Sequence, residues 1–299
     1  MTTTTDNPSV DFLSPLTGPQ VGRLVCLALA VVRRLGYELM YRDGVLQPTD
    51  PRASGPILGL SNLARAIAHQ DPAGWPQAVE RHFTDLIRRL EEGVPDPPAD
   101  PERALVQRLV PRAALPAEWT ADRPDFLPGL LSVPAAEQGD VVTMFLNPSD
   151  LGLTWSAAEG FGLANLRRRT DTVDFVDVGG VQIAALTGDS FTASRALVID
   201  AVLRDSLAIS TPPSGLLVAL PSRDLLLIHV IRDLGAIPAL GHLINHAVRT
   251  YNQAPGPLSP DVHLVTFTPT PTWYPATSAH SPTTLTLSPE LSALLKEFS

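Results

Sequence analysis

The chain has 299 residues, of which 44% are hydrophobic and 18% charged, a composition typical of globular proteins rather than of disordered chains. Its formal net charge of −9 argues against a nucleic-acid partner, because affinity for phosphates depends on clustered cations. A single cysteine, Cys26, excludes an internal disulfide and a cysteine-based zinc site. No apolar run approaches the roughly 20 residues of a membrane span, and the N-terminus lacks the basic region of a signal peptide. We therefore expect a cytoplasmic protein with no membrane partner.

The N-terminal region is predicted to form a helix–hairpin–helix subdomain. Residues 1–17 are polar and are expected to be disordered. Asp43-Gly44 joins two short β-prone runs, which predicts a hairpin because tight hairpin turns need positive φ values. The Pro-rich run 93–102 is the clearest linker in the chain. It divides the chain into an N-terminal subdomain, 18–92, and a C-terminal α+β domain, 103–299.

The stretch 156–231 has the clearest succession of elements. Ser156 and Glu159 form an S-x-x-E capping box, which predicts the start of a helix. Gly179-Gly180 between two β-prone runs predicts a hairpin, and a second helix follows Gly188-Asp189. Two almost continuously apolar runs, 216–220 and 225–231, are typical of buried strands. The predicted order is helix, strand, strand, helix, strand, strand.

The remaining segments complete a mixed architecture. Residues 269–282 are rich in Thr, Ser and Pro and are predicted to be a loop with Trp273 and Tyr274 exposed. Antiparallel hairpins prevail over regular β-α-β alternation, so we predict an α+β fold of short hairpin strands packed against helices. An L-x-N-L-x-R echo at 60–65 and 163–168 allows two related subdomains, although a match this short also arises by chance. Further predicted strands are 105–110, 127–133, 141–146, 262–267 and 285–287, and further helices are 19–35, 61–69, 237–251 and those beginning near Pro76 and Pro289.

No motif specifies a reaction, a metal or a cofactor. The sequence contains no G-x-S-x-G elbow, no phosphate-binding P-loop and no H-E-x-x-H. His242 and His246 lie one helical turn apart and are weak metal candidates, because no acidic partner accompanies them. We therefore predict no metal, no cofactor and no catalytic residue.

Candidate binding residues stand at three places. Arg223-Asp224 separates two buried strands, and Asp189 precedes a helix; each has a simpler explanation, as a solvated turn and as an N-cap. Trp273 and Tyr274 are candidates for partner contact, since aromatic residues are enriched at binding hot spots. The alternative is that these two aromatic side chains fold back over the core. Three further acids, Asp171, Asp174 and Asp177, are expected on the solvated face of one strand.

The order of several short motifs resembles that of the YtpQ-like bacterial proteins, a family of unknown function. These motifs are Leu60-Ser61-Asn62-Leu63, Leu109-Val110-Pro111-Arg112, Asn165-Leu166, Gly188-Asp189 with Ser194, and the run Val218 to Leu226. The resemblance covers roughly residues 55 to 235, rests on the order of unspecific motifs and implies no catalytic residues. The α-β-β-α-β-β-α order from Ser156 also resembles that of type III secretion chaperones, which dimerise and hold a partner polypeptide along apolar grooves.

These observations together favour a non-enzymatic binding or escort protein. Its expected partner is a protein or peptide, held in a homodimer or a hetero-complex. One alternative is an uncharacterised enzyme with a polar site near Asp189, Arg223 and Asp224. Another is an immunity or accessory factor of a bacterial gene cluster.

Overall fold

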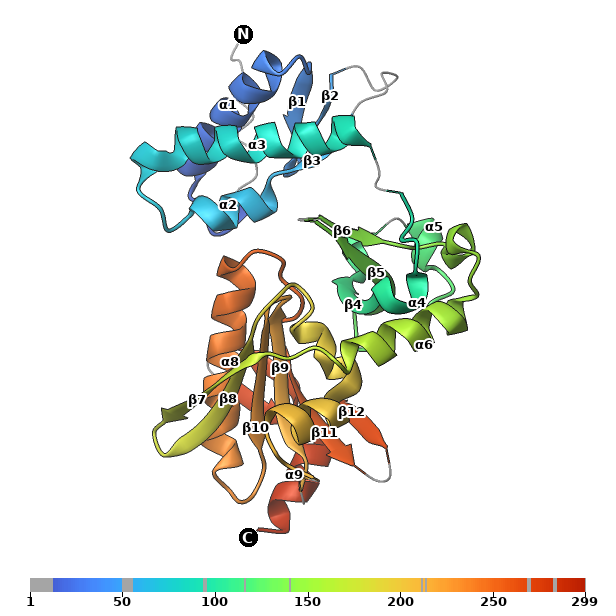
Figure 1. The fold of residues 1–299 in the computed structure, drawn as a ribbon. Coiled ribbons are helices and arrows are strands. Elements are labelled where there is room, and N and C mark those ends of the chain that lie inside the picture. The colour runs from blue at the N-terminus through green and yellow to red at the C-terminus, as the bar shows by residue number, and fades with distance from the viewer. Residues whose placement is uncertain are drawn as a thin grey trace. The chain divides into compact units, whose positions relative to one another are not determined.

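The computed structural model describes residues 13–49, 56–93, 96–115, 117–139, 141–210, 212, 214–267, 270–281 and 284–298. The chain divides into two compact units. Unit 1 comprises Met1–Pro95 with Asn252–Pro255, and unit 2 comprises Asp96–Tyr251 with Gly256–Ser299. The division after Pro95 falls inside the Pro-rich run. Helices accompany antiparallel sheets in both units, so the predicted α+β fold class is confirmed (Figure 1).

Unit 1 packs its helices and a small antiparallel sheet around one apolar cluster, with Trp75 and Phe83 fully buried. Asp43 and Gly44 have φ values of 47° and 85° and form the predicted hairpin turn. The expectation of disorder through residue 17 is wrong for residues 13–17, because Leu13 and Leu16 are buried in this core; residues 1–12 lie outside the described residues. The elements are α1 (Gly18–Arg34), β1 (Leu39–Arg42), β2 (Val45–Pro48), β3 (Leu58–Gly59), α2 (Ser61–Ile67) and α3 (Trp75–Glu92).

Unit 2 is built around a six-stranded antiparallel sheet with the order β12-β11-β9-β10-β8-β7. Gly179 and Gly180 have φ values of 63° and 84° and join β7 to β8 in the predicted hairpin. The sheet consists of β7 (Thr172–Val178), β8 (Val181–Thr187), β9 (Leu216–Ser222), β10 (Leu225–Val230), β11 (Val262–Phe267) and β12 (Pro271–Pro275).

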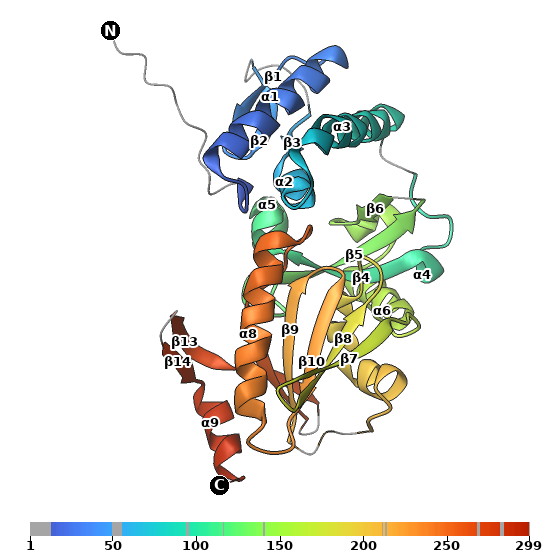
Figure 2. The same ribbon diagram turned by 90° about the vertical axis from the view of Figure 1, so that its left-hand side faces the viewer.

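A different helical segment covers each face of this sheet. On one face, α8 (Ala236–Gln253) and α9 (Pro289–Lys296) share an apolar cluster with the strands. Figure 2 shows α8 lying lengthwise along the sheet. On the other face, residues 193–206 form consecutive 3-10, α and π turns and contribute to a second apolar cluster. The helix expected after Gly188-Asp189 is therefore present, but with an irregular winding.

A second, three-stranded antiparallel sheet in unit 2 carries α6 (Trp155–Leu166). Among the described helices, none combines the length and the apolar character that a membrane crossing requires. The remaining elements are α4 (Pro101–Ala104), β4 (Leu105–Pro111), α5 (Ala117–Thr120), β5 (Leu130–Gln138), β6 (Val141–Met144), β13 (Thr277–Ser281) and β14 (Thr284–Leu287).

The start of α6 differs from the sequence prediction. The side chain of Thr154 accepts a hydrogen bond from the Ala157 amide at 3.2 Å, so Thr154 is the N-cap. The prediction that Ser156 caps this helix is wrong, because Ser156 already lies in the first helical turn. Both residues are hydroxyl-bearing, and a hydroxyl pattern alone does not distinguish between cap positions two residues apart.

Gly162 lets α6 approach strand β4 closely. A Cβ built on Gly162 would lie 2.8 Å from the Oε1 of Gln107 and 2.9 Å from its backbone nitrogen. Gln107 is 1% exposed and belongs to the strand, so the backbone has no room to move aside. Gly160, in the same helix, has no atom within 4 Å of the corresponding position.

We expect Gly162→Ala to lower the free energy of unfolding by about 1–3 kcal/mol, because the added methyl group overpacks the contact with Gln107. Gly160→Ala is the matched control and should raise the same quantity by about 0.5–1 kcal/mol, since it improves helix propensity without a steric conflict. Denaturant unfolding of the two variants checks both signs. Equal changes in the free energy of unfolding for the two variants would contradict a close approach of α6 to β4 at Gly162.

His263 is a buried polar residue of β11, the second strand of the six-stranded sheet. It is 3% exposed, and neither ring nitrogen has a hydrogen-bond partner among the described residues. Its ring centroid lies 6.2 Å from that of Trp273. Burial lowers the pKa of His263 to about 4, and the nearby charge of Asp261 opposes this shift only in part. The native sheet therefore holds the neutral imidazole.

This burial predicts a pH dependence of stability. The unfolded chain binds a proton to this imidazole below about pH 6.5, whereas the folded chain does so only near pH 4, so the free energy of unfolding falls as the pH drops through that window. The loss attributable to His263 is about 3 kcal/mol, at about 1.4 kcal/mol per pKa unit. His263→Leu should remove this part of the slope, measured by denaturant unfolding between pH 4.5 and 8. Leu264→Val, at a buried position of the same strand that carries no titratable group, is the control and should lower the stability without changing the slope.

Candidate functional site

Strand β7 forms one open edge of the six-stranded sheet. It pairs with β8 on one side, and no described strand pairs with its other side. Phe175 is 58% exposed and Val176 is 46% exposed, which is unusual for large apolar side chains. Since consecutive strand residues point to opposite faces, these two side chains mark the two faces of the same edge.

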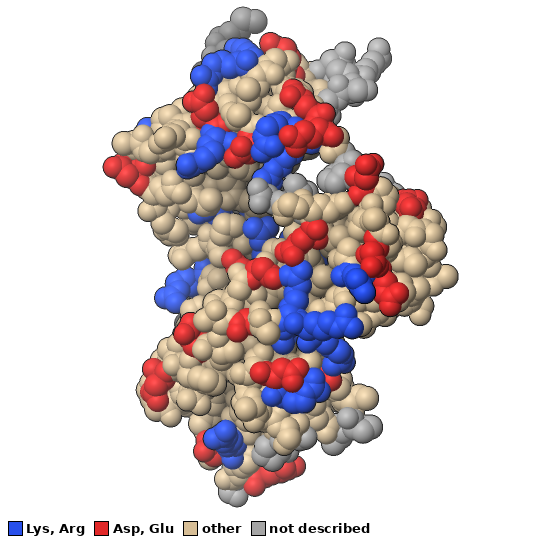
Figure 3. All heavy atoms as spheres, viewed as in Figure 1, with Lys and Arg blue, Asp and Glu red and all other residues tan. Residues whose placement is uncertain are grey.

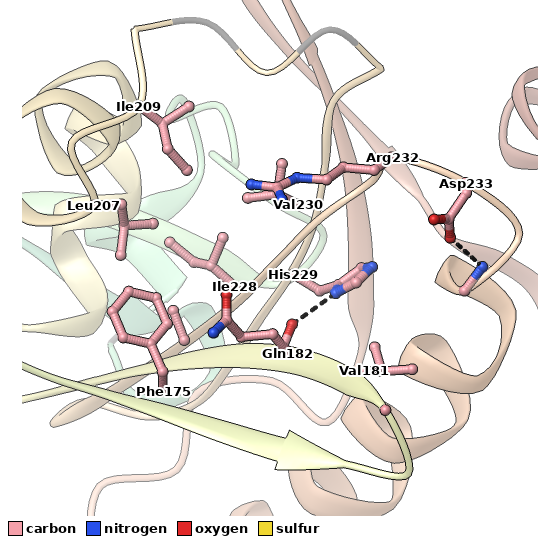
Figure 4. Close-up of a pocket in the computed structure, with 13 residues that line it drawn as sticks. Phe175, Val181, Gln182, Leu207, Ile209, Ile228, His229, Val230, Arg232 and Asp233 are labelled. Atoms are coloured by element: carbon pink, nitrogen blue, oxygen red, sulfur yellow. Dashed lines mark hydrogen bonds between the residues drawn. The ribbon is translucent and has the colours of Figure 1, made fainter.

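A cavity of about 220 Å³, here called the His229 cavity, lies beside β7 on the face of Phe175. In Figure 4, Phe175, Ile228 and Leu207 form its apolar side, and the guanidinium group of Arg232 extends over it. Asp233 is turned away, because its carboxylate accepts a hydrogen bond from the Gly235 amide at 2.7 Å. The cavity therefore has an apolar side and a polar side, with a cation at its rim.

The His229 cavity exists because two strands separate. Strands β10 and β8 are paired from Leu225 as far as Ile228, opposite Ala184. At the next position, the Nδ1 of His229 lies 2.8 Å from the Gln182 carbonyl oxygen. A carbonyl can only accept, so Nδ1 carries the hydrogen and the imidazole replaces a backbone contact where the strands diverge.

A groove of about 370 Å³, here called the α8 groove, lies on the opposite face of the hairpin. Val176, Val178 and Leu227 contribute apolar surface, and the polar side is contributed by α8. Its full lining is Val176, Val178, Ile183, Ala185, Leu227, His242, Leu243, Asn245, His246 and Arg249. Strand β7 thus has a hollow beside each of its faces.

His242 and His246 both line the α8 groove, as their spacing predicts, but they do not form a metal centre with other described residues. No group of three or more His, Cys, Asp or Glu able to hold a metal occurs in the described part of the chain. His246 Nδ1 lies 3.3 Å from the guanidinium of Arg249. Burial lowers the pKa of His246, and the charge of Arg249 lowers it further. A neutral imidazole here is a hydrogen-bonding group at the groove.

The base of β7 is held by a buried ion pair that sequence reasoning missed. Arg195, whose side chain is 1% exposed, contacts Asp171, whose side chain is 2% exposed, and also donates to Ser206 at 3.1 Å. The prediction that Asp171 lies on a solvated face is therefore wrong. Burial raises the pKa of Asp171, and the bond to Arg195 opposes that shift. Ser194 adds a tie to β4, because its hydroxyl accepts from the Leu109 amide at 2.9 Å.

The three polar candidates do not form one site. Asp189 contacts the guanidinium of Arg169 and accepts from the Phe191 amide at 2.7 Å. Asp224 is exposed and accepts from the Ser222 hydroxyl at 2.6 Å, which is a local turn contact. Arg223 lies beside the segment that follows Asp189, since its carbonyl accepts from the Ala193 amide at 3.0 Å. The Asp189 and Asp224 carboxylates thus have different partners, and Arg223 is tied through its backbone to the segment that follows Asp189.

Trp273 and Tyr274 are not in an exposed loop. They lie in strand β12, paired with Val265 and Leu264 of β11, and both are half-buried. The ring of Trp273 meets that of Phe126 edge to face at 5.2 Å. The loop prediction is wrong for residues 271–275 and 277–281, because strand pairing overrides the turn-like Thr/Pro composition. The alternative, that these side chains fold back over the core, is the observed arrangement.

No protein-family model, no curated protein and no solved structure matches this chain. The resemblance to the YtpQ-like proteins and to type III secretion chaperones therefore stays a prediction from motif and element order. The functional argument rests on the geometry of this chain's own residues, and above all on the open edge of β7 between the His229 cavity and the α8 groove.

Proposed function

We propose that this protein is a non-enzymatic, cytoplasmic binding or escort protein that holds an extended segment of a partner polypeptide along the open edge of β7. The observation that carries the proposal is the exposure of Phe175 and Val176 on an edge strand whose outer side pairs with no described strand and that has a hollow beside each face. Addition of a strand to a sheet edge is a common mode of peptide recognition.

The backbone of β7 supplies the first part of the interaction. In an antiparallel pair, hydrogen-bonded and non-hydrogen-bonded residue pairs alternate. Every second residue of β7 therefore directs its amide and carbonyl away from β8, toward the open edge. Proteins ordinarily shield such an edge with charge, proline or a covering element, since it otherwise pairs with other chains. Asp174 and Asp177 place exposed carboxylates on β7, whereas Phe175 and Val176 at its centre provide exposed apolar side chains between them.

Side chains supply the second part. Residues of an added strand would alternate between the two faces, so one set would reach the His229 cavity and the other the α8 groove. Both hollows have an apolar floor, and each has an arginine in its lining, Arg232 in one and Arg249 in the other. We therefore expect the preferred segment to carry apolar residues at alternate positions with a carboxylate at a rim.

The engagement of the candidate acids favours binding over catalysis. Asp189 is committed to Arg169 and to a backbone amide, and Asp224 is committed to Ser222. A general acid or base needs a group poised toward a substrate. The element order from α6 to α8, which resembles that of chaperones holding a partner along apolar grooves, supports the same proposal.

The proposal predicts that extended peptides bind at β7. Selection from a random peptide library on the intact protein should return alternating apolar sequences. Phe175→Lys and Val176→Lys should each weaken their binding by at least tenfold, because a charge at an edge strand opposes strand addition and removes apolar contact. Isothermal calorimetry measures the affinity, and hydrogen exchange should show new protection of the β7 amides.

The matched control is Met144→Lys on β6, an edge strand of the three-stranded sheet β4-β5-β6. Met144 is 37% exposed there. This variant should leave peptide binding unchanged. All three variants should keep the free energy of unfolding within about 0.5 kcal/mol of the parent, since the replaced side chains are exposed. The proposal fails if no peptide is selected, or if the selected peptides bind the β7 variants as tightly as the parent.

A further inference from the structure

One face of α8 directs polar side chains toward the α8 groove. Four polar residues of this helix line the groove at intervals of three and four positions: His242, Asn245, His246 and Arg249. Side chains at this spacing lie on the same face of a helix, one above the other. The four residues therefore form a continuous hydrogen-bonding wall along one side of the groove.

The strands supply the opposite side of the groove, and that side is apolar. It consists of residues from β7, β8 and β10, namely Val176, Val178, Ile183, Ala185 and Leu227. The volume of about 370 Å³ is near the lower end of the range found for small-molecule sites. A ligand that fills this groove has to combine an apolar surface with a hydrogen-bonding group.

The groove extends from the β7–β8 turn along α8. His242 marks the end near the turn, because a Cβ built on Gly179 would lie 4.0 Å from its Nε2. Arg249 follows about two helical turns later, about 10 Å along the helix axis. Since α8 lies lengthwise along the sheet (Figure 2), the polar wall follows the strands over this distance. The shape suits an elongated ligand with its polar group at one end.

The charge of the groove lining is opposite in sign to that of the chain. Arg249 is permanently charged, and none of the described residues that line the groove is acidic. Asp and Glu side chains are spread over the visible face of the molecule (Figure 3), in keeping with the net charge of −9. Asp174 lies on the same face of β7 as Val176 but does not line the groove. The complementary ligand is therefore an anion.

Arg249 has N–H donors available for such an anion. Among the described residues, its guanidinium has one hydrogen-bond partner, the Nδ1 of His246, at 3.3 Å. Because Nδ1 accepts, the hydrogen of the neutral His246 ring is on Nε2, which is then a donor. The remaining donors of Arg249 form a planar fork that matches the two oxygens of a carboxylate. Both residues thus offer donors at the end of the groove farther from the hairpin turn.

We propose that the α8 groove binds a small amphipathic carboxylate. The carboxylate pairs with Arg249, and an apolar chain about 10 Å long lies along the strands toward His242. Two observations favour this ligand over a cationic or neutral one: the positive lining and the available N–H donors of Arg249. The inference does not rest on the proposed function, because a small molecule in the groove needs no strand added to β7.

The test is the binding of octanoate to the intact protein, measured by isothermal calorimetry and by thermal unfolding. Octanoate should bind and should raise Tm as its concentration increases. 1-Octanol and acetate should each bind at least tenfold more weakly, because the first lacks the charge and the second lacks the chain. From butanoate to octanoate, the affinity should rise roughly fourfold with each buried CH₂ group.

Arg249→Gln should weaken octanoate binding at least tenfold while keeping the stability of the parent in denaturant unfolding, since Arg249 is exposed. Arg204→Gln is the control for loss of a charge, because Arg204 pairs with Asp205 on the surface, and it should bind octanoate like the parent. Phe175→Lys, outside the groove lining, should also bind octanoate, which separates this site from peptide binding at β7. The proposal is overturned if octanoate does not bind, if 1-octanol binds as tightly, or if Arg249→Gln retains the parent affinity for octanoate.

Discussion

The buried pair of Arg195 and Asp171 is the interaction on which the functional region of unit 2 depends. It fixes the residue before β7 to the irregular helical segment on the other side of the sheet. The same segment is tied to β4 through Ser194 and to the β9–β10 turn through the Ala193 amide. Removing one member of such a pair leaves an uncompensated buried charge and typically costs about 3–5 kcal/mol. This pair and the pairing with β8 hold the hairpin in place. The outer side of β7 pairs with no described strand.

The candidate site at β7 is a consequence of how the sheet ends beside this strand. Strands β8 and β10 separate at Ile228, and the imidazole of His229 bridges the gap through Gln182. The hollow that results lies beside an edge strand with exposed apolar side chains. The ring of Phe191 lies near the guanidinium groups of Arg108 and Arg169, and Arg169 pairs with Glu137 and Asp189. Two guanidinium groups and two carboxylates are present at that contact, whereas the edge at β7 is apolar at its centre and open.

The sequence predicts features that depend on neighbouring residues, such as hairpin turns. It does not predict features that depend on contacts between residues far apart in the chain. Gly179-Gly180 and Asp43-Gly44 predict their hairpins because positive φ values are a local requirement. Asp171 and Arg195 are 24 residues apart, and the hydrophobic periodicity of the sequence does not indicate that they form a buried ion pair. Likewise, the composition around Trp273 indicates a loop, whereas pairing with β11 imposes a strand. The His229 cavity arises from a divergence between strands, which leaves no trace in either strand's own pattern.

The base of the β7 hairpin is buried and its centre is exposed, so substitutions in the two parts have different consequences. Substitutions at the base alter a charge pair that is 1–2% exposed, so the two members can change only together. Substitutions at Phe175 and Val176 change side chains that are 58% and 46% exposed, and such substitutions usually alter the free energy of unfolding little. If β7 holds a partner segment as proposed, substitutions at these two positions can change which segment binds, while the Arg195–Asp171 pair keeps the hairpin in place. Binding preference and folding would then depend on different residues of the same hairpin.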